Sequence, residues 1–434
     1  MHTVCIDFGT SSLRAAIRRR AVVEPLAIAP GSPIDNASIP SAIYIPESRK
    51  EICFGVDALK RGQAENRPFL FEQSPKSWLT PDNIGSLDSP AASGLPFTRR
   101  NLLCALLSLS VDSTLKCAKL SDKDPYELRI SHPSWSAKDR KKLGAEYESL
   151  RQAVLMRRAP AIKQVMPVSE FADWCGDAES GSVRVSVEEP VAAALSVLDD
   201  VDDNRASVLL AVDIGAGTID LGYFSFVAPD SSLGARLRLL NLVDPISIFG
   251  AGDKIDGELL DIFVRKGRLN LTDEASVRNR IREYKENIFE GGTAAFGRIT
   301  VERSELMARE ALSRMARDLE CQITRMVGAT RESLSKSGTV PLDRFQFIHV
   351  VFSGGGADLE FLTDAVMRGI AAVNLGVDVK THIPGTFRNH EVEASRARMA
   401  VALGGVVEDK YWPETDWKNA VHLKGLHSIK KSSI

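Results

Sequence analysis

The sequence predicts an α/β protein that is built from two similar halves. Three observations lead to this prediction. The chain opens with an apolar strand, a glycine-centred turn and a second strand in residues 1–17. The same arrangement returns at residues 209–226, and short β-prone runs alternate with helical segments along the rest of the chain. Alignment of Asp7–Thr10 with Asp213–Thr218 therefore indicates one supersecondary unit that is used twice.

The first half begins with the opening hairpin and continues as a meander of short strands. β-Prone runs at Val22–Ile28 and Ile39–Ile45 flank the turn Pro30–Pro33. Residues 79–96 are rich in Pro, Gly, Ser and Asp, which predicts a solvated loop. An apolar helix is expected from Asn101 onward, and a strand follows it at Tyr126–Ile130.

An acidic cluster at residues 199–204 precedes the second half, which opens with the apolar strand Ser207–Asp213. The segment Lys254–Val327 is predicted to be helical, because apolar residues between Leu306 and Met326 recur as on one face of a long helix. Three further elements are predicted, namely a strand at Phe347–Phe352, a helix at Leu359–Val373, and a helix at Glu391–Val407 whose small residues permit close packing.

The predicted organisation has a first lobe at residues 1–192, a second lobe at 193–407 with a helical upper subdomain at about 254–330, and a tail at 408–434. The 434 residues carry 55 basic and 57 acidic side chains, a net charge of -2 that gives no global field for nucleic acid or membrane binding. The chain has no long apolar run or leader-like N-terminus, and its six cysteines are widely spaced. We therefore expect a cytoplasmic protein with reduced thiols.

Three glycine-rich turns predict an anion site, because glycine lets consecutive backbone N–H groups approach a phosphate closely. The chain contains no Gly-Lys-Ser/Thr, and the turn at Gly354–Gly356 lacks the third glycine of a dinucleotide fingerprint, so neither a P-loop nor a Rossmann site is expected. Asp7 and Asp213 stand at the ends of two of the strands. Such a carboxylate pair suits a magnesium nucleotide, to which the hydroxyls of Thr10 and Thr218 add donors.

Five motifs, in this order, resemble those of the actin-like ATPase superfamily, and in particular the nucleotide-binding domain of the seventy-kilodalton heat-shock chaperones. The motifs are IDFGTS (residues 6–11), EEPVAAAL (188–195), VDIGAGTID (212–220), FSGGGADL (352–359) and MAVALGG (399–405). The resemblance implies a two-lobed actin-like (ribonuclease-H-like) ATPase fold, with duplicated βββαβα lobes around a nucleotide cleft, and ATP or ADP with Mg²⁺ as ligands.

The resemblance also implies roles for individual residues. Lys76, Glu189, Asp213 and Thr218 would be catalytic, and Asp7 and Asp213 would hold Mg²⁺ through water. Asp220 would support Thr218. Charge neutralisation by Lys76 would help because hydrolysis spreads negative charge over the γ-phosphate. The remaining nucleotide-binding positions would be Gly9, Thr10, Ser11, Gly215, Ala216, Gly217, Lys285, Gly354, Gly355 and Gly356.

Several positions depart from the family pattern or have simpler explanations. Arg282 stands in place of a glutamate that contacts adenosine, Asp358 in place of an arginine that stacks on adenine, and Ser12 in place of an aromatic residue. Lys76 could be a solvated lysine, and Lys285 and Arg282 could lie on a solvated helix face. Glu188 precedes Glu189, which leaves the register of the catalytic glutamate open, although Glu189-Pro190 fits the motif better.

The expected function is a chaperone-like ATPase that switches lobe closure to act on a protein partner in trans, such as a co-chaperone, an exchange factor or a client. The family's peptide-binding domain is not expected after Gly405. Three alternatives remain open: an actin-like filament former that self-associates, a small-metabolite phosphotransferase, and a nucleotide-locked scaffold with negligible turnover. The chaperone-like Glu189 and Lys76 argue against the phosphotransferase.

Overall fold

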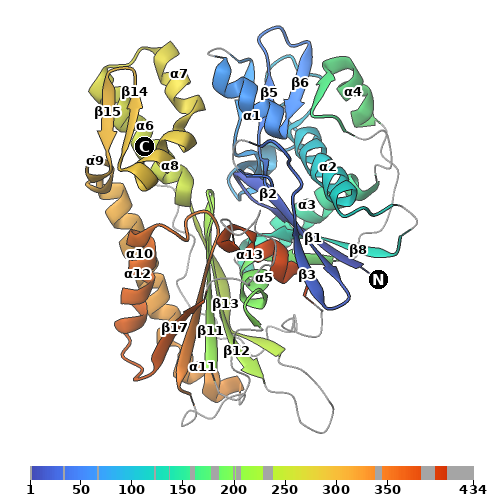
Figure 1. The fold of residues 1–434 in the computed structure, drawn as a ribbon. Helices are drawn as coiled ribbons and strands as arrows, with labels where there is room; N and C mark the ends of the chain where they lie inside the picture. Colours follow the sequence, from blue (N-terminus) through green and yellow to red (C-terminus); the bar gives the residue numbers. More distant parts are fainter. Residues whose placement is uncertain are drawn as a thin grey trace.

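The protein is a mixed α/β structure with several sheets (Figure 1). The computed structural model describes residues 2–407 apart from 33–34, 66–67, 122–123, 136, 157–161, 177–184, 199–200, 202–206, 228–237, 338–344 and 383–395. Two sheets form its centre, one from each half of the chain.

The sheet of the first half has the order β10-β8-β1-β2-β3, with β4 paired to β2. Its first three strands are antiparallel neighbours, namely β1 (His2–Phe8), β2 (Ser12–Arg19) and β3 (Val22–Leu26). On the other side of β1 lie two strands parallel to it, β8 (Tyr126–His132) and β10 (Val185–Glu188). The short strand β4 (Ile39–Pro40) completes the sheet.

The sheet of the second half has the order β13-β12-β11-β16-β17. The antiparallel strands are β11 (Ser207–Ile214), β12 (Thr218–Val227) and β13 (Arg238–Phe249), and the strands parallel to β11 are β16 (Phe347–Ser353) and β17 (Asp378–His382). Each sheet thus has three antiparallel strands followed by two strands parallel to the first. The repeated unit predicted from the sequence is confirmed at the level of strand order.

Two short helices, α5 (Glu189–Leu195) and α13 (Arg396–Gly405), lie between the two sheets (Figure 1). They share an apolar cluster with residues of both sheets, including Cys5 of β1 and Ala211 of β11. A Cβ atom on Gly404 would lie 1.6 Å from the carbonyl oxygen of Ala192. The contact of α13 with α5 therefore requires glycine at this position, as the small residues of the predicted helix suggested.

A smaller sheet and four helices complete the first half. The sheet has the order β7-β5-β6-β9, with β7 (Leu70–Glu72), β5 (Ile43–Ile45), β6 (Glu51–Phe54) and β9 (Val165–Pro167). The helices are α1 (Gly55–Ala64), α2 (Arg99–Cys117), α3 (Ala137–Met156) and α4 (Val168–Gly176), and two 3₁₀ turns lie at Pro75–Leu79 and Ile84–Ser86.

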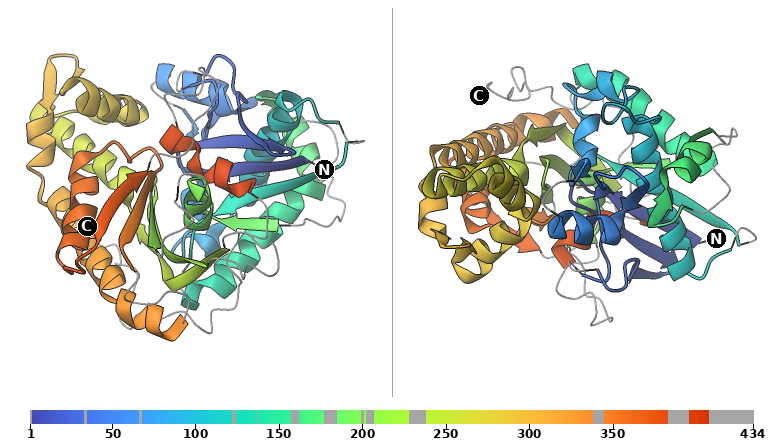
Figure 2. Two further views of the ribbon diagram at one scale, coloured as in Figure 1. Left: turned by 60° about the horizontal axis from the view of Figure 1, so that its bottom comes forward. Right: turned by 90° about the horizontal axis from the view of Figure 1, so that it is seen from above.

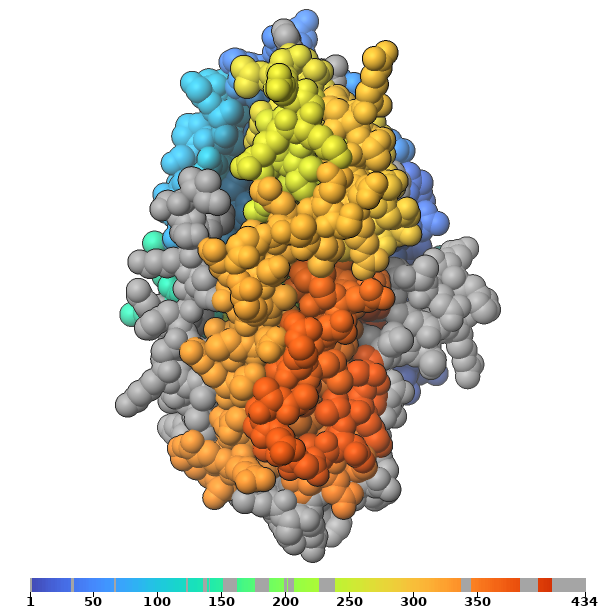
Figure 3. All heavy atoms as spheres, turned by 90° about the vertical axis from the view of Figure 1, so that its left-hand side faces the viewer, coloured from blue at the N-terminus to red at the C-terminus, as the bar shows by residue number. Residues whose placement is uncertain are grey.

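The second half contains a largely helical region that lies opposite the first half when seen from above (Figure 2). Its elements are α6 (Ala251–Gly267), α7 (Leu271–Asn279), α8 (Ile281–Gly291), β14 (Thr293–Phe296), β15 (Ile299–Glu302), α9 (Arg303–Met307), α10 (Glu310–Gly328), α11 (Thr330–Ser337) and α12 (Glu360–Ala371). Helices α10 and α12 pack side by side (Figure 3). Thr324 of α10 donates a hydrogen bond of 3.2 Å to the carbonyl oxygen of Gly369 in α12.

Three predictions about local structure are wrong. The stretch 79–96 has a loop-like backbone but is not simply solvated, because Leu87 is fully buried and Ile84 and Leu95 are also buried. The hairpin β14–β15 interrupts the segment that was predicted to be helical, and Leu306 lies on α9 rather than on the long helix α10. The apolar run Ile39–Ile45 divides into β4 and β5, which belong to different sheets.

Other predictions fall partly outside the described residues. The last helix begins at Arg396, and the predicted residues 391–395 before it lie outside the description, as do the tail at 408–434 and all of the acidic cluster except Val201. The lobe boundary between residues 192 and 193 falls inside α5. All six cysteines are free thiols. In the part of the chain that the structure describes, every helix is too short or too polar to cross a bilayer.

Candidate functional site

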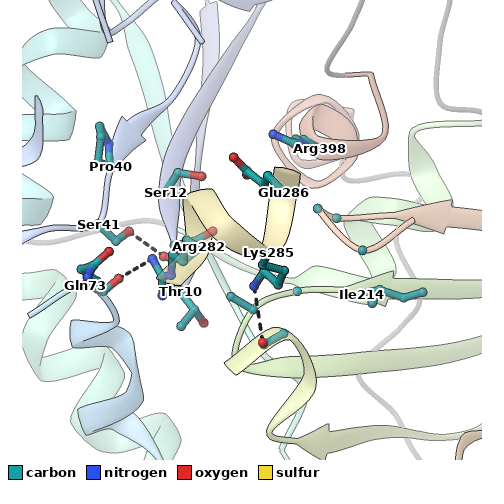
Figure 4. Close-up of a pocket in the computed structure, with 18 of the residues that line it drawn as sticks. Thr10, Ser12, Pro40, Ser41, Gln73, Ile214, Arg282, Lys285, Glu286 and Arg398 are labelled. Atoms are coloured by element: carbon teal, nitrogen blue, oxygen red, sulfur yellow. Dashed lines mark hydrogen bonds between the residues drawn. The ribbon is translucent and has the colours of Figure 1, made fainter. Parts of the chain in front are cut away.

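A cavity of about 420 Å³ lies between the two halves of the protein (Figure 4). Its walls come from the turn after β1, the turn after β11, the turn after β16, the 3₁₀ turn at Pro75–Leu79, and the helices α5, α6, α8 and α13. All of the predicted site residues except Gly217 and Asp220 line this cavity. Residues that are separated by up to several hundred positions in the sequence thus meet at one place.

The two exceptions lie directly behind the wall of the cavity. Asp220 is fully buried and its Oδ2 accepts a hydrogen bond of 2.6 Å from the hydroxyl of Thr218, which lines the cavity. Gly217 lies against the turn of the first half, since a Cβ atom on it would be 2.8 Å from Oγ1 of Thr10. The two turns therefore touch across the boundary between the halves, and Asp220 holds the Thr218 side chain.

Several glycines of the glycine-rich turns leave no room for a side chain. Gly354 has φ of +82°, in the left-handed region that favours glycine, and a Cβ atom on it would lie 2.4 Å from the carbonyl oxygen of Ile214. A Cβ atom on Gly9 would lie 2.4 Å from the carbonyl oxygen of Ser12. The backbone itself therefore forms these parts of the wall, which is the surface that a closely bound phosphate or nucleoside needs.

Lys76 and Glu189 form a buried ion pair at the base of the cavity. The ammonium of Lys76 donates to Oε1 of Glu189 at 2.5 Å, and the two residues are only 6% and 4% exposed. Burial alone would lower the pKa of Lys76, but Glu189 and Asp7 outweigh it and raise that pKa. Ser131 connects the pair to Asp7, because its Oγ lies 3.1 Å from Oδ1 of Asp7 and 3.4 Å from Oε1 of Glu189.

The base of the cavity holds more buried acids than buried bases. Burial raises the pKa of Asp7 and of Glu189, and for Glu189 the neighbouring carboxylates add to this rise. Burial, followed by the charge of Asp7, raises the pKa of Asp213 from 3.8 to about 7, although Ser353 donates a hydrogen bond of 2.7 Å to its Oδ1. The site therefore favours a bound cation or a bound proton.

Some side chains around the cavity could hold a divalent cation or a phosphate ligand. One carboxylate oxygen from each of Glu189, Asp213 and Asp220 lies within 4.8 Å of the others. Carboxylates at this spacing can hold Mg²⁺ directly or through its water shell. Two buried donors of the cavity wall, Oγ of Ser12 and Nε of Arg14, have no hydrogen-bond partner among the described residues. A ligand with acceptor oxygens would satisfy them.

The structure decides between the alternatives for three charged residues. Lys76 is not a solvated lysine. Lys285 and Arg282 are not on a solvated face, because both line the cavity and their side chains are 16% and 19% exposed. Lys285 pairs with Oδ1 of Asp256 at 2.8 Å. Arg282 donates to the carbonyl oxygen of Gln73 at 2.7 Å and also contacts Ser74 (Figure 4).

Of the two adjacent glutamates, Glu189 lines the cavity, while Oε2 of Glu188 lies 3.4 Å from the hydroxyl of Ser134. The departures at Asp358 and Ser12 also lie in the cavity wall. The sequence reasoning missed Arg14, although an arginine within the apolar strand SLRAAI was a signal that could have found it.

Comparison with known proteins finds no family model that matches this sequence and no curated protein that is significantly similar to it. The motifs and the geometry of the cavity are therefore the observations that bear on function.

Proposed function

We propose that this protein is a chaperone-like ATPase of the two-lobed actin-like type, which binds and hydrolyses ATP with Mg²⁺ and couples the nucleotide to closure of its lobes. One observation carries the proposal. Residues from four of the five motifs that resemble the chaperone ATPases line one cavity between two sheets of the same strand order, and the fifth motif, at residues 399–405, directly follows Arg398, which also lines it. The cavity is lined by Asp7 of one sheet and Asp213 of the other.

In this proposal, each residue at the base of the cavity has a role in hydrolysis. The turns at Gly9–Ser11 and Gly215–Gly217 would surround the phosphate chain. The charged ammonium of Lys76 would stabilise negative charge on the γ-phosphate oxygens. Glu189, whose pKa is raised by burial, is suited to orient the attacking water and to accept its proton. Thr218, held by Asp220, would contact the γ-phosphate.

A bound Mg²⁺ would neutralise charge on the β- and γ-phosphates during phosphoryl transfer. Asp7 and Asp213 would hold it through water. Both carboxylates are 7% exposed, and each already accepts a hydrogen bond from a serine hydroxyl, Ser131 for Asp7 and Ser353 for Asp213. These hydrogen bonds orient the carboxylates before a ligand arrives.

Steady-state ATP hydrolysis with and without Mg²⁺ tests the proposal. We expect Asp213→Asn to reduce the rate at least tenfold while the protein stays folded, because the side chain serves the metal and the water and does not pack an apolar core. Asp364→Asn, which removes an exposed carboxylate on α12 outside the cavity, is the matched control and should leave the rate unchanged. Hydrolysis at the wild-type rate in Asp213→Asn would refute the proposed site.

A second candidate, a nucleotide-locked scaffold with slow turnover, is favoured by the contacts of Arg282. This residue comes from α8 of the second half and binds Gln73 of the first half, and it lies 3.5 Å from Oδ1 of Asp253. In the same region, the side-chain amide of Gln73 donates to the carbonyl oxygen of Asn279 at 3.2 Å. Contacts of this kind across the cleft would slow release of a bound nucleotide. Turnover far slower than the chemical step, restored by Arg282→Ala, would support this candidate.

The proposal extends to the output of the ATPase, which would be a partner protein acting in trans. Opening and closing of the cleft would move the surfaces of the two lobes relative to each other. Limited proteolysis with ATP, with ADP and without nucleotide should give different patterns, and identical patterns would contradict the switch. Sedimentation under the same three conditions separates this function from filament formation, since a filament former would pellet only with nucleotide.

A further inference from the structure

Arg14 is a buried arginine in the wall of the cavity. In the β1–β2 ladder it lies opposite Asp7, so its side chain and that of Asp7 share one face of the sheet, and both line the cavity. Arg14 is 7% exposed. Ser12 lies two residues earlier on the same strand, is 1% exposed and also lines the cavity. Because side chains alternate along a strand, Ser12 and Arg14 present their polar groups to the same space.

These two side chains have unused hydrogen-bond donors. Nε of Arg14 and Oγ of Ser12 have no hydrogen-bond partner among the residues that the structure describes. The neighbouring carboxylates of Asp7 and Asp213 accept hydrogen bonds from Ser131 and Ser353, and none of the hydrogen bonds that the structure describes for them comes from Arg14. A buried guanidinium nitrogen without a hydrogen-bond acceptor is costly for the folded protein, so a ligand that supplies an acceptor there would be favoured.

A second cation lies close to Arg14. Arg398 of α13 lines the same cavity, and its charge is among those that lower the pKa of Arg14, although burial is the largest cause. Figure 4 shows the side chain of Arg398 extending from α13 toward the side of the cavity where Ser12 lies. Three carboxylates raise the pKa of Arg14 and so offset part of the effect of burial and of Arg398, namely those of Asp7, Asp35 and Asp213. A further anion between the two arginines would reduce their mutual repulsion. Ser12 and Arg14 belong to the first half, and Arg398 to the second.

We infer that Arg14, Ser12 and Arg398 form a phosphate-binding subsite that holds the phosphate chain of the nucleotide beside the turn Gly9–Ser11. This inference deepens the proposed function and rests on it for the identity of the ligand. Guanidinium groups keep their charge and match phosphate oxygens with two parallel hydrogen bonds. Arg14 and Arg398 together offer two positive charges, which suits a polyanion such as a di- or triphosphate. The same chemistry would also bind free pyrophosphate.

The subsite is tested by calorimetric titration of the nucleotide-free protein with ATP and, separately, with inorganic pyrophosphate, both in EDTA so that metal binding does not contribute. We expect Arg14→Gln to weaken both ligands at least tenfold and Arg14→Lys to weaken them less, because lysine keeps the charge but not the planar pair of donors. Arg18→Gln is the matched control. Arg18 lies on the same strand, donates to Oγ1 of Thr3 at 3.2 Å and is outside the cavity, so its loss should not change either affinity.

The outcomes separate this inference from the proposed function. If Arg14→Gln binds both ligands as the wild type does, the subsite is refuted, while the ATPase proposal stands. If the wild type binds pyrophosphate through Arg14 but does not bind ATP, the subsite stands and the nucleotide proposal falls. If Arg14→Gln does not fold, Arg398→Gln gives the same test from the other wall, with a weakening of at least threefold expected and unchanged affinities refuting the subsite.

Discussion

Replacement of Asp213 by asparagine is predicted to stabilise the ligand-free protein, by an amount that grows with pH. Burial and the charge of Asp7 raise the pKa of this carboxyl from 3.8 to about 7 in the folded state. The folded protein therefore binds the proton more tightly than the unfolded chain, and its stability falls as pH rises from about 4 to about 7. Asparagine has no such charge, and its Oδ1 can still accept the hydrogen bond that Ser353 donates to Asp213.

The size of the effect follows from the two pKa values. One pKa unit corresponds to about 1.4 kcal/mol, so ionisation of Asp213 costs the folded state about 4 kcal/mol at pH 8. At pH 5 the carboxyl is protonated in the folded protein but ionised in the unfolded chain. Folding must then bind a proton to it, which lowers the stability by only about 1.6 kcal/mol. The advantage of Asp213→Asn should therefore increase by about 3 kcal/mol between pH 5 and pH 8.

Urea unfolding in EDTA, without nucleotide, at pH 5, 6, 7 and 8 measures this difference. The free energy of unfolding is compared for the wild type, Asp213→Asn and the control Asp364→Asn, whose side chain is exposed on α12. The control should follow the wild type at every pH. An advantage of Asp213→Asn that is the same at pH 5 and pH 8, or a loss of stability that grows with pH, would refute the idea that this carboxyl is forced toward its protonated form.

Three further predictions concern stability and the contacts between the halves. Gly404→Ala should lower the free energy of unfolding, measured by chemical denaturation, by several kcal/mol, because the new Cβ would lie 1.6 Å from the carbonyl oxygen of Ala192. A loss below about 1 kcal/mol would show that α13 can move away from α5 at little cost. Lys76→Met should lower the free energy of unfolding by about 3–5 kcal/mol, because it leaves Glu189 buried without its partner. The double variant Lys76→Met/Glu189→Gln should recover part of that loss, whereas losses that simply add would contradict the pairing. Arg282→Ala should make the nucleotide-free protein more sensitive to limited proteolysis at the cleft, since it removes the hydrogen bond to Gln73; unchanged cleavage would show that this contact does not hold the halves together.

Several features of the fold and of the candidate site could be predicted because they depend on local sequence. The strand before Gly9, the strand before Gly215 and the acidic residues at their ends are encoded by neighbouring residues, and the repeated strand order confirms the duplicated unit. By contrast, Leu87 lies in a stretch of turn-forming residues and is nevertheless fully buried. Leu87 is buried because elements distant in the sequence pack over it, and the composition of residues 79–96 cannot predict such packing.

The base of the cavity shows why the rest required the structure. Lys76 and Glu189 are separated by 113 positions, and Arg282 and Gln73 by 209, so no local pattern specifies either contact. Arg14 reaches the cavity through the register that places it opposite Asp7. A shift of that register by one residue would turn its side chain to the other face of the sheet.

Local sequence was enough to predict the α/β class, the repeated hairpin with its glycine-rich turns, and Asp7 and Asp213 as candidate site residues, because strand periodicity and turn chemistry act over a few neighbouring residues. The folded chain was needed to show which charges share the cavity, that Lys285 and Arg282 face it, and that Arg14 has a buried donor available. Burial, pKa values and contacts between the halves arise when distant segments exclude water together, and that happens only in the folded chain.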